Sequence, residues 1–222
     1  MSEEATHIEL PDGRAVTALW TAVDRPSWIF VYAPGAGSNV RDPFGAAAAQ
    51  ELAERRIATL RFQFPYSEQG RKAPDREPVL EATWRAALGV ARERAERVVV
   101  GGRSMGGRIA TQVVSQGEHV DAIGAFAYPL HPPGRPERRR DVHLGTLDAP
   151  ILFCSGTNDA FASPDELEEL AGRVPGATLH LLAGADHGFA VPKSSGRTRP
   201  DVWHEAIETF ATWLAALERD QA

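Results

Sequence analysis

The segment that most constrains the fold is residues 98–107, which read VVVGGRSMGG. Three consecutive valines predict a buried strand, and the residues that follow Ser104 predict a helix. A serine at such a tight strand-to-helix turn has a strained backbone, so its neighbours have to be small. Gly102 and Gly106, two residues on either side, provide that room. The segment therefore predicts a nucleophile elbow, in which the Ser104 hydroxyl projects from the sheet and the N–H of Met105 faces an oxyanion.

Glycine-rich turns also occur in phosphate-binding loops, and the sequence argues against both common kinds. A Walker A loop needs Lys and then Ser or Thr after its last glycine, whereas Gly107 is followed by Arg108 and Ile109. A dinucleotide-binding fingerprint starting at Gly35 would place its third small residue on Val40, and no acidic residue ends the next predicted strand. An ordinary glycine turn remains the alternative to the nucleophile elbow.

Eight apolar runs are spaced along the chain like the strands of one sheet. They cover residues 7–10, 15–20, 28–33, 58–62, 97–101, 122–128, 150–155 and 177–182. The first two flank a turn sequence typical of an antiparallel hairpin, and the last six are separated by segments long enough for crossover helices. Apolar residues recur at the helical period over 80–91 and 203–217. We expect one α/β domain over residues 1–222, with a mostly parallel eight-stranded sheet, helices on both faces and no separate cap domain.

Composition narrows the class of protein. A hydrophobic share of 43% and a charged share of 24% are typical of a globular domain, and a net charge of −6 argues against nucleic acid as a partner. The acidic N-terminal residues lack an apolar stretch, so we expect no signal peptide, no membrane partner and a cytoplasmic location. The single cysteine, Cys154, excludes an internal disulfide and lies in an apolar run, which predicts a buried structural thiol. The sequence does not indicate an oligomeric state.

A serine nucleophile needs a base to take its proton and a carboxylate to orient that base. His187 follows the last predicted strand in a glycine-flanked turn, at the edge where sites assemble in open parallel sheets, whereas the other six histidines fall in predicted strands, a helix or loops. Asp159 follows the preceding strand in the same way. Asp186 is the chain neighbour of His187, and Asp165 fits the first turn of a helix. The chain order is then Ser104, Asp159, His187, as in the α/β-hydrolase fold.

A second oxyanion donor is expected in the loop after the third predicted strand, which reads YAPGAGS over residues 32–38. Its glycines allow the backbone to approach a substrate carbonyl closely. We assign the N–H of Ala36 as this donor, paired with that of Met105, and Gly37 is the close alternative. A simple glycine turn is the other interpretation of this loop.

Two polar stretches, residues 65–77 and 131–147, predict long loops that are available to cover the site. Within them, Tyr66, Arg71 and His131 are candidate substrate contacts at its mouth. Arg71 would either favour an anionic substrate or form a structural salt bridge. The arginine run at 138–140 is interpreted as solvated surface.

With these motifs the chain resembles the α/β-hydrolase superfamily over nearly its whole length. Within it, the chain is similar to the compact dienelactone-hydrolase-like group, which includes a testis-expressed hydrolase-like protein and the hydrolase-like domain of a chromatin-complex subunit. The matching segments are residues 33–37, 62–66, 70–75, 102–107, 128–134, 156–161 and 185–187. The resemblance implies Ser104 as nucleophile, Asp159 as acid and His187 as base. Dienelactone hydrolases proper usually carry a cysteine nucleophile, so their substrate is not implied.

The sequence therefore predicts a serine hydrolase that cleaves a small-molecule acyl ester or thioester and needs no metal or organic cofactor. A binding or scaffold protein that keeps the fold without the chemistry is the main alternative. A peptidase would use the same residues on an amide, but a further substrate-gating domain would then be expected.

Overall fold

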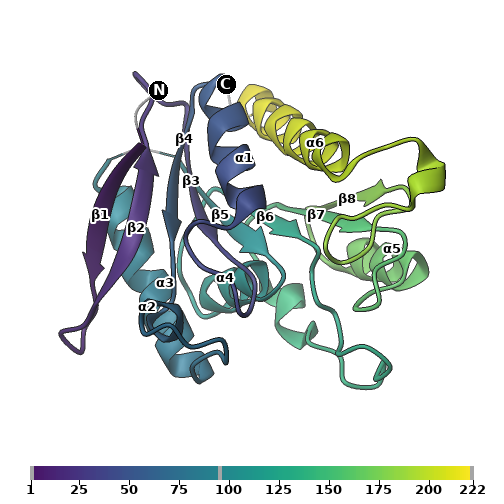
Figure 1. Cartoon of the computed structure of the whole chain (residues 1–222), viewed down its shortest axis with the longest axis horizontal. Helices are drawn as coiled ribbons and strands as arrows, with labels where there is room; N and C mark the ends of the chain where they lie inside the picture. Colours follow the sequence, from purple (N-terminus) through teal and green to yellow (C-terminus); the bar gives the residue numbers. More distant parts are fainter. Residues whose placement is uncertain (1–2, 95–96, 221–222) are drawn as a thin grey trace.

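A computed structural model of the chain describes residues 3–94 and 97–220, and these residues form eight strands (Figure 1). The strands are β1 (Glu3–Glu9), β2 (Ala15–Thr21), β3 (Trp28–Ala33), β4 (Ile57–Phe62), β5 (Val98–Arg103), β6 (Ala122–Phe126), β7 (Ile151–Gly156) and β8 (Ala177–Leu182). They make one sheet in the spatial order β1-β2-β4-β3-β5-β6-β7-β8. β1 and β2 form an antiparallel hairpin, β2 pairs antiparallel with β4, and β3 to β8 are all parallel. The predicted mostly parallel eight-stranded sheet is confirmed.

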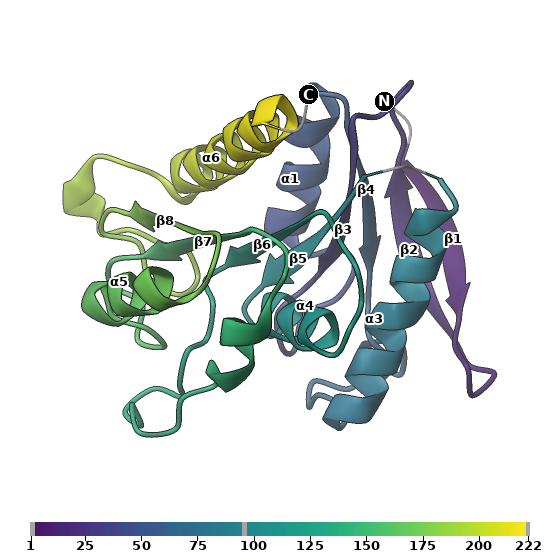
Figure 2. The ribbon, with the colours of Figure 1, turned by 180° about the vertical axis from the view of Figure 1, so that it is seen from behind.

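The same residues form six α-helices and two 3₁₀ helices. They are α1 (Pro43–Ala53), α2 (Pro65–Glu68), α3 (Glu77–Arg92), α4 (Met105–Ser115), α5 (Pro164–Arg173), α6 (Arg199–Asp220), η1 (Val142–Thr146) and η2 (Lys193–Ser195). α1 and α6 cover one face of the sheet, and α3, α4 and α5 cover the other (Figures 1 and 2). No helix in the described part of the chain has the combination of length and apolar character that crossing a bilayer requires.

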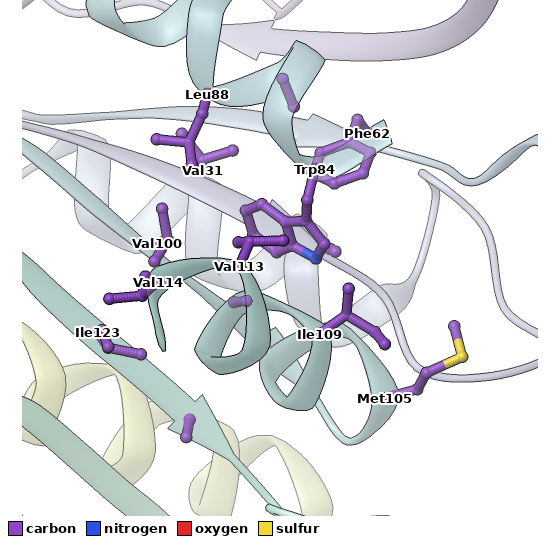
Figure 3. Packing of buried hydrophobic residues seen from close by; sticks show 14 of the residues in the cluster. Val31, Phe62, Trp84, Leu88, Val100, Met105, Ile109, Val113, Val114 and Ile123 are labelled. Atoms are coloured by element: carbon purple, nitrogen blue, oxygen red, sulfur yellow. The ribbon is translucent and has the colours of Figure 1, made fainter. Parts of the chain in front are cut away.

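The core under α3 and α4 is formed by branched aliphatic residues of the central strands and by apolar side chains of the two helices (Figure 3). Trp84 of α3 is fully buried and meets Phe62 of β4 edge to face, with ring centroids 4.9 Å apart. Val113 and Ile109 of α4 pack beside it. These contacts explain the helical period of apolar residues in α3, since one face of the helix lies on the sheet.

The core on the opposite face is mostly aromatic. Phe210 of α6 lies against Phe30 and Phe126 on the central strands, with centroid distances of 4.8 and 5.4 Å. Gly124 of β6 makes this approach possible, because a Cβ there would be 2.7 Å from a ring carbon of Phe210. Cys154 is buried in the same core, as predicted, and burial raises the pKa of its thiol.

The two stretches predicted as long loops are mostly loop, but each also contains a short helical turn. Residues 65–77 begin with α2, where Pro65 occupies the first turn and needs no hydrogen-bond acceptor for its nitrogen. Residues 131–147 contain η1, which packs on α4. The arginine run in this second stretch is only partly solvated: Arg138 is exposed, but Arg139 pairs with Asp141 and Arg140 is half-buried.

Candidate active site

Ser104 lies between β5 and α4 with φ 52° and ψ −119°, a left-handed conformation that a residue other than glycine adopts only under strain. The chain around it is packed against the end of β3. A Cβ at Gly102 or at Gly106 would collide with the carbonyl oxygen of Ala33, so both positions have to be glycine. The N–H of Ser104 donates to the carbonyl of Phe126, at 2.8 Å, and ties the turn to β6. The geometry is that of the predicted nucleophile elbow.

His187 and Asp159 come together with Ser104 in one hydrogen-bonded row. His187 Nε2 is 2.9 Å from Ser104 Oγ, and His187 Nδ1 is 2.8 Å from Asp159 Oδ2. The carboxylate can only accept, so the proton of a neutral imidazole belongs on Nδ1, and Nε2 faces the serine hydroxyl as an acceptor. This is the tautomer that a general base for Ser104 requires.

The carboxylate and the imidazole are each fixed by a further contact. The Asp159 side chain is 0% exposed, and its Oδ1 accepts the N–H of Phe161 at 2.8 Å. The Phe161 ring stacks on the His187 imidazole with centroids 4.0 Å apart and planes 26° apart. Phe161 thereby positions both partners of Ser104, a role that the sequence analysis missed although the residue lies only two positions after Asp159.

The two other candidate aspartates are engaged elsewhere. Asp186 Oδ1 accepts the N–H groups of Gly188 and Ala190, both at 2.8 Å, and so closes the turn that carries His187. Asp165 lies in the first turn of α5, after Ser163, which caps the helix together with Glu166. The structure brings neither aspartate to the imidazole.

Ala36 and Met105 lie with Ser104 on the wall of the same cavity. In residues 3–94 and 97–220, no protein acceptor pairs with the N–H of Ala36 or with that of Met105. The N–H of Gly37, in contrast, donates to the hydroxyl of Tyr66 at 3.2 Å. The geometry therefore favours Ala36 over Gly37 as the partner of Met105 in binding an oxyanion.

The cavity above Ser104 has a volume of about 420 Å³, a size that suits a small-molecule ligand. It lies at the carboxyl ends of the parallel strands and receives residues from both polar stretches. Its lining residues are Gly35, Ala36, Ser38, Asp42, Pro74, Asp75, Glu77, Leu80, Arg103, Ser104, Met105, Arg108, Pro129, Arg140, Phe161 and His187.

The described residues that line this cavity do not include Tyr66, Arg71 or His131. Tyr66 is fully buried, and its hydroxyl accepts the N–H of Gly37 in the loop of residues 32–38, the proposed oxyanion loop. Arg71 forms a salt bridge with Asp75 at 2.6 Å, which is the structural alternative that the sequence left open. His131 is buried, with Nε2 3.2 Å from a carboxylate oxygen of Glu166. Tyr66 and Arg71 thus contact segments next to the cavity, whereas His131 ties its own stretch to α5.

A buried polar group behind the oxyanion loop was not found from the sequence. Asp42 caps α1 by accepting the N–H of Gly45 at 2.9 Å and also accepts the hydroxyl of Tyr32 at 2.5 Å. Burial and the neighbouring carboxylate raise the pKa of Tyr32 well above its usual range, so the phenol stays protonated and donates. Arg103, the residue before Ser104, lies 3.8 Å from the same carboxylate. The sequence did not indicate Tyr32 and Arg103, because their common partner, Asp42, comes close to them only in the folded chain.

Within the described residues, no group of three or more His, Cys, Asp or Glu side chains is arranged to hold a metal ion.

A family model described as "Alpha/beta hydrolase domain" matches residues 26–215. Among solved structures, Est1E from Butyrivibrio proteoclasticus is 13% identical and superposes with a TM-score of 0.74, covering 95% of this chain and 99% of that one. A putative dienelactone hydrolase from Klebsiella pneumoniae is 18% identical with a TM-score of 0.74, covering 97% and 99%. The esterase domain of a Rhodothermus marinus protein is 15% identical with a TM-score of 0.72, covering 96% and 98%. At such identities the likeness to these structures is one of fold.

Proposed function

The chain belongs to the alpha/beta hydrolase domain family, and from that premise we propose that it is a serine hydrolase that cleaves small-molecule carboxylic esters or thioesters. Membership confirms the resemblance to the superfamily that the motifs indicated. The similarity to the narrower group with the testis-expressed and chromatin-associated proteins stays a prediction.

The observation that carries the proposal is the row from Ser104 Oγ through His187 to the buried Asp159, with separations of 2.9 and 2.8 Å. It opens on a cavity whose lining also includes Ala36 and Met105. A nucleophile, a base, an orienting carboxylate and two oxyanion donors are the set that acyl transfer requires.

In the first half of the reaction, Ser104 Oγ attacks the acyl carbon while its proton passes to His187 Nε2. The bond from the acyl carbon to the leaving oxygen or sulfur then breaks, and the imidazolium returns the proton to the departing alcohol or thiol. Ser104 is left acylated. In the second half, His187 takes a proton from water as the water oxygen attacks the acyl carbon. The bond from the acyl carbon to Ser104 Oγ then breaks, the carboxylic acid leaves, and His187 gives the proton to Oγ.

Stabilisation of the tetrahedral oxyanion comes from the backbone donors. In comparable sites one such donor contributes about 2.7–4 kcal/mol to the transition state. Because Ala36 and Met105 belong to segments that are packed against each other at Ala33, their N–H groups are held in place before substrate binds. Asp159 keeps the imidazole oriented throughout and stabilises its charged form.

The test is labelling with a fluorophosphonate probe, followed by location of the adduct and by kinetics of Ser104→Ala. We expect the adduct on Ser104, and a fall in turnover of roughly 10⁴-fold or more in the variant, with the melting temperature unchanged. Near-normal turnover by Ser104→Ala would refute the assignment. Absence of an adduct on the native protein would favour a scaffold over an enzyme.

A panel of substrates then separates the reaction classes. It contains aliphatic acyl esters, thioesters and peptides, together with an aromatic acyl ester, since a structure of Est1E was solved with ferulic acid bound. We expect esters or thioesters to be hydrolysed and peptides to be left intact.

A further inference from the structure

Charge around the cavity is nearly balanced by pairs of side chains. The carboxylates on its wall are those of Asp42, Asp75 and Glu77, and an arginine lies close to each. The pairs are Arg108–Glu77, Arg103–Asp42 and Arg71–Asp75, with N–O distances of 2.8, 3.8 and 2.6 Å. Arg71 lies outside the lining, so the lining holds three carboxylates and three arginines, and within residues 3–94 and 97–220 no carboxylate lies within 4.0 Å of the third arginine, Arg140. Among the described residues, Arg140 is therefore the lining arginine that has no carboxylate at salt-bridge distance.

The backbone of Arg140 is anchored firmly. Its N–H donates to the carbonyl of Leu130 at 2.8 Å, and its carbonyl accepts the hydroxyl of Tyr128 at 2.8 Å. Tyr128, two residues after the end of β6, is fully buried, and burial raises the pKa of its hydroxyl, so it remains a donor. The half-buried Arg140 side chain thus belongs to the built wall of the cavity that contains Ser104.

A second cation, Arg108, lies on the same wall. It stands one helical turn after the nucleophile, since its N–H donates to the carbonyl of Ser104 at 3.0 Å, and its side chain is 13% exposed. Burial and the nearby charge of Arg108 lower the pKa of Arg140, but a guanidinium stays protonated in proteins. The Glu77 carboxylate pairs with Arg108 and acts to raise the pKa of Arg140, so it offsets part of the repulsion between the two cations. A ligand carboxylate beside Arg140 would offset more of it.

This inference rests on the proposed function and specifies its substrate. We propose that Arg140, with Arg108, binds a carboxylate carried by the substrate, so that the enzyme prefers esters with one free carboxylate. A planar carboxylate matches the fork of a guanidinium in a bidentate arrangement. One guanidinium without a salt-bridge partner matches the charge of a monoanion better than that of a dianionic phosphate.

The experiment compares kcat/KM for two matched pairs of esters. Monophenyl glutarate against phenyl pentanoate places the carboxylate on the acyl side, and 3-carboxyphenyl butyrate against phenyl butyrate places it on the alcohol side. We expect the charged ester to be preferred in one pair, and the pair identifies the side. In Arg140→Gln that preference falls by about 10- to 100-fold, the range of one charge-assisted hydrogen bond.

Two further variants separate a charge effect from a structural one. Arg140→Lys keeps the positive charge and retains part of the preference, although it loses the fork. Arg138→Gln removes an exposed arginine two residues earlier in the same stretch and leaves the preference unchanged. The preference of the native protein also weakens as ionic strength rises.

A binding measurement makes the result independent of turnover. Calorimetric titration of glutarate into the native protein is expected to show binding that Arg140→Gln weakens by at least about 10-fold. Hydrolysis of neutral esters without preference in either pair, together with no glutarate binding, overturns this inference and leaves the proposed function intact. If no ester or thioester of any kind is hydrolysed, the proposed function fails. In that case the glutarate titration alone tests the carboxylate subsite. Binding that is lost in Arg140→Gln supports the subsite, and absence of binding to the native protein overturns it.

Discussion

At the scale of single residues, two aspartates compete for His187, and the fold separates their roles. Asp186 precedes His187 in the chain, but its carboxylate is used by the backbone of the turn. Asp159 comes from the loop after the neighbouring strand, and its buried carboxylate contacts the imidazole. Position at the end of a parallel strand is thus a better guide to the partner than proximity along the chain.

The two aspartates make a matched pair of variants. We expect Asp159→Asn to lower kcat by about 10⁴-fold, because an amide in this place favours the wrong imidazole tautomer. Asp186→Asn keeps an oxygen that can accept the two N–H groups of its turn, so its kcat stays within a few-fold of the native value. Steady-state kinetics on an activated ester measure both, with circular dichroism to check folding. Equal losses in the two variants would contradict the assignment of Asp159.

Elsewhere at this scale the sequence was only partly informative. Ser104, Asp159 and His187 could be predicted because each follows an apolar run, and the carboxyl ends of parallel strands meet at one edge. Arg140 could not, because a run of three arginines has the composition of solvated surface. Its backbone is held at the cavity wall by hydrogen bonds to Leu130 and Tyr128, and these bonds exist only in the folded chain.

At the scale of elements, the unit that matters is β5 with α4, packed against the end of β3. A Cβ at Gly106 would lie 2.6 Å from the carbonyl carbon of Ala33 and 2.8 Å from the carbonyl oxygen of Pro34. Backbone atoms cannot rotate out of the way as a side chain can. Any larger residue at this position has to push the oxyanion loop away from the nucleophile.

Replacement of two helical glycines tests this constraint. Gly106→Ala is expected to destabilise the protein by about 1–3 kcal/mol through overpacking and to lower kcat. Gly89→Ala, in α3 where an added Cβ meets nothing within 4 Å, should raise the stability by about 0.5–1 kcal/mol and leave kcat unchanged. Urea unfolding gives both free energies. A neutral Gly106→Ala would show that the two segments are not in tight contact.

The elements themselves were largely predictable from the pattern of apolar residues. All eight strands were found because each carries side chains that are buried under helices. β1 begins earlier than expected, at Glu3, since main-chain pairing with Thr21 needs no apolar side chains. The turn at Pro65–Glu68 was missed, although proline at the first helical position is a recognised start signal.

At the scale of the whole molecule, the sheet separates an aliphatic core under α3 and α4 from an aromatic core under α6. The cavity lies at the edge of the sheet where the parallel strands end, and its lining includes no residue of α6. The helix that covers the aromatic core is therefore separate from the cavity. A substitution in this core should lower the free energy of unfolding more than it lowers kcat.

Truncation of Phe210 tests that division. Phe210→Ala is expected to lower the free energy of unfolding by about 3–5 kcal/mol, because the ring is fully buried between Phe30 and Phe126. Thr212→Ala, at an exposed position of the same helix, should change it by no more than about 0.5 kcal/mol. At a temperature where both variants are folded, their kcat values should match that of the native protein. A large loss of kcat in folded Phe210→Ala would show that the aromatic core is coupled to the site.

The carbonyl of Ala33 lies where a Cβ at either Gly102 or Gly106 would have to go. A protein engineer who grafts this serine onto another scaffold cannot move the strand–serine–helix segment alone. The end of β3 has to be moved together with it, because the turn that carries Ser104 and the loop that carries Ala36 are in contact at the Ala33 carbonyl.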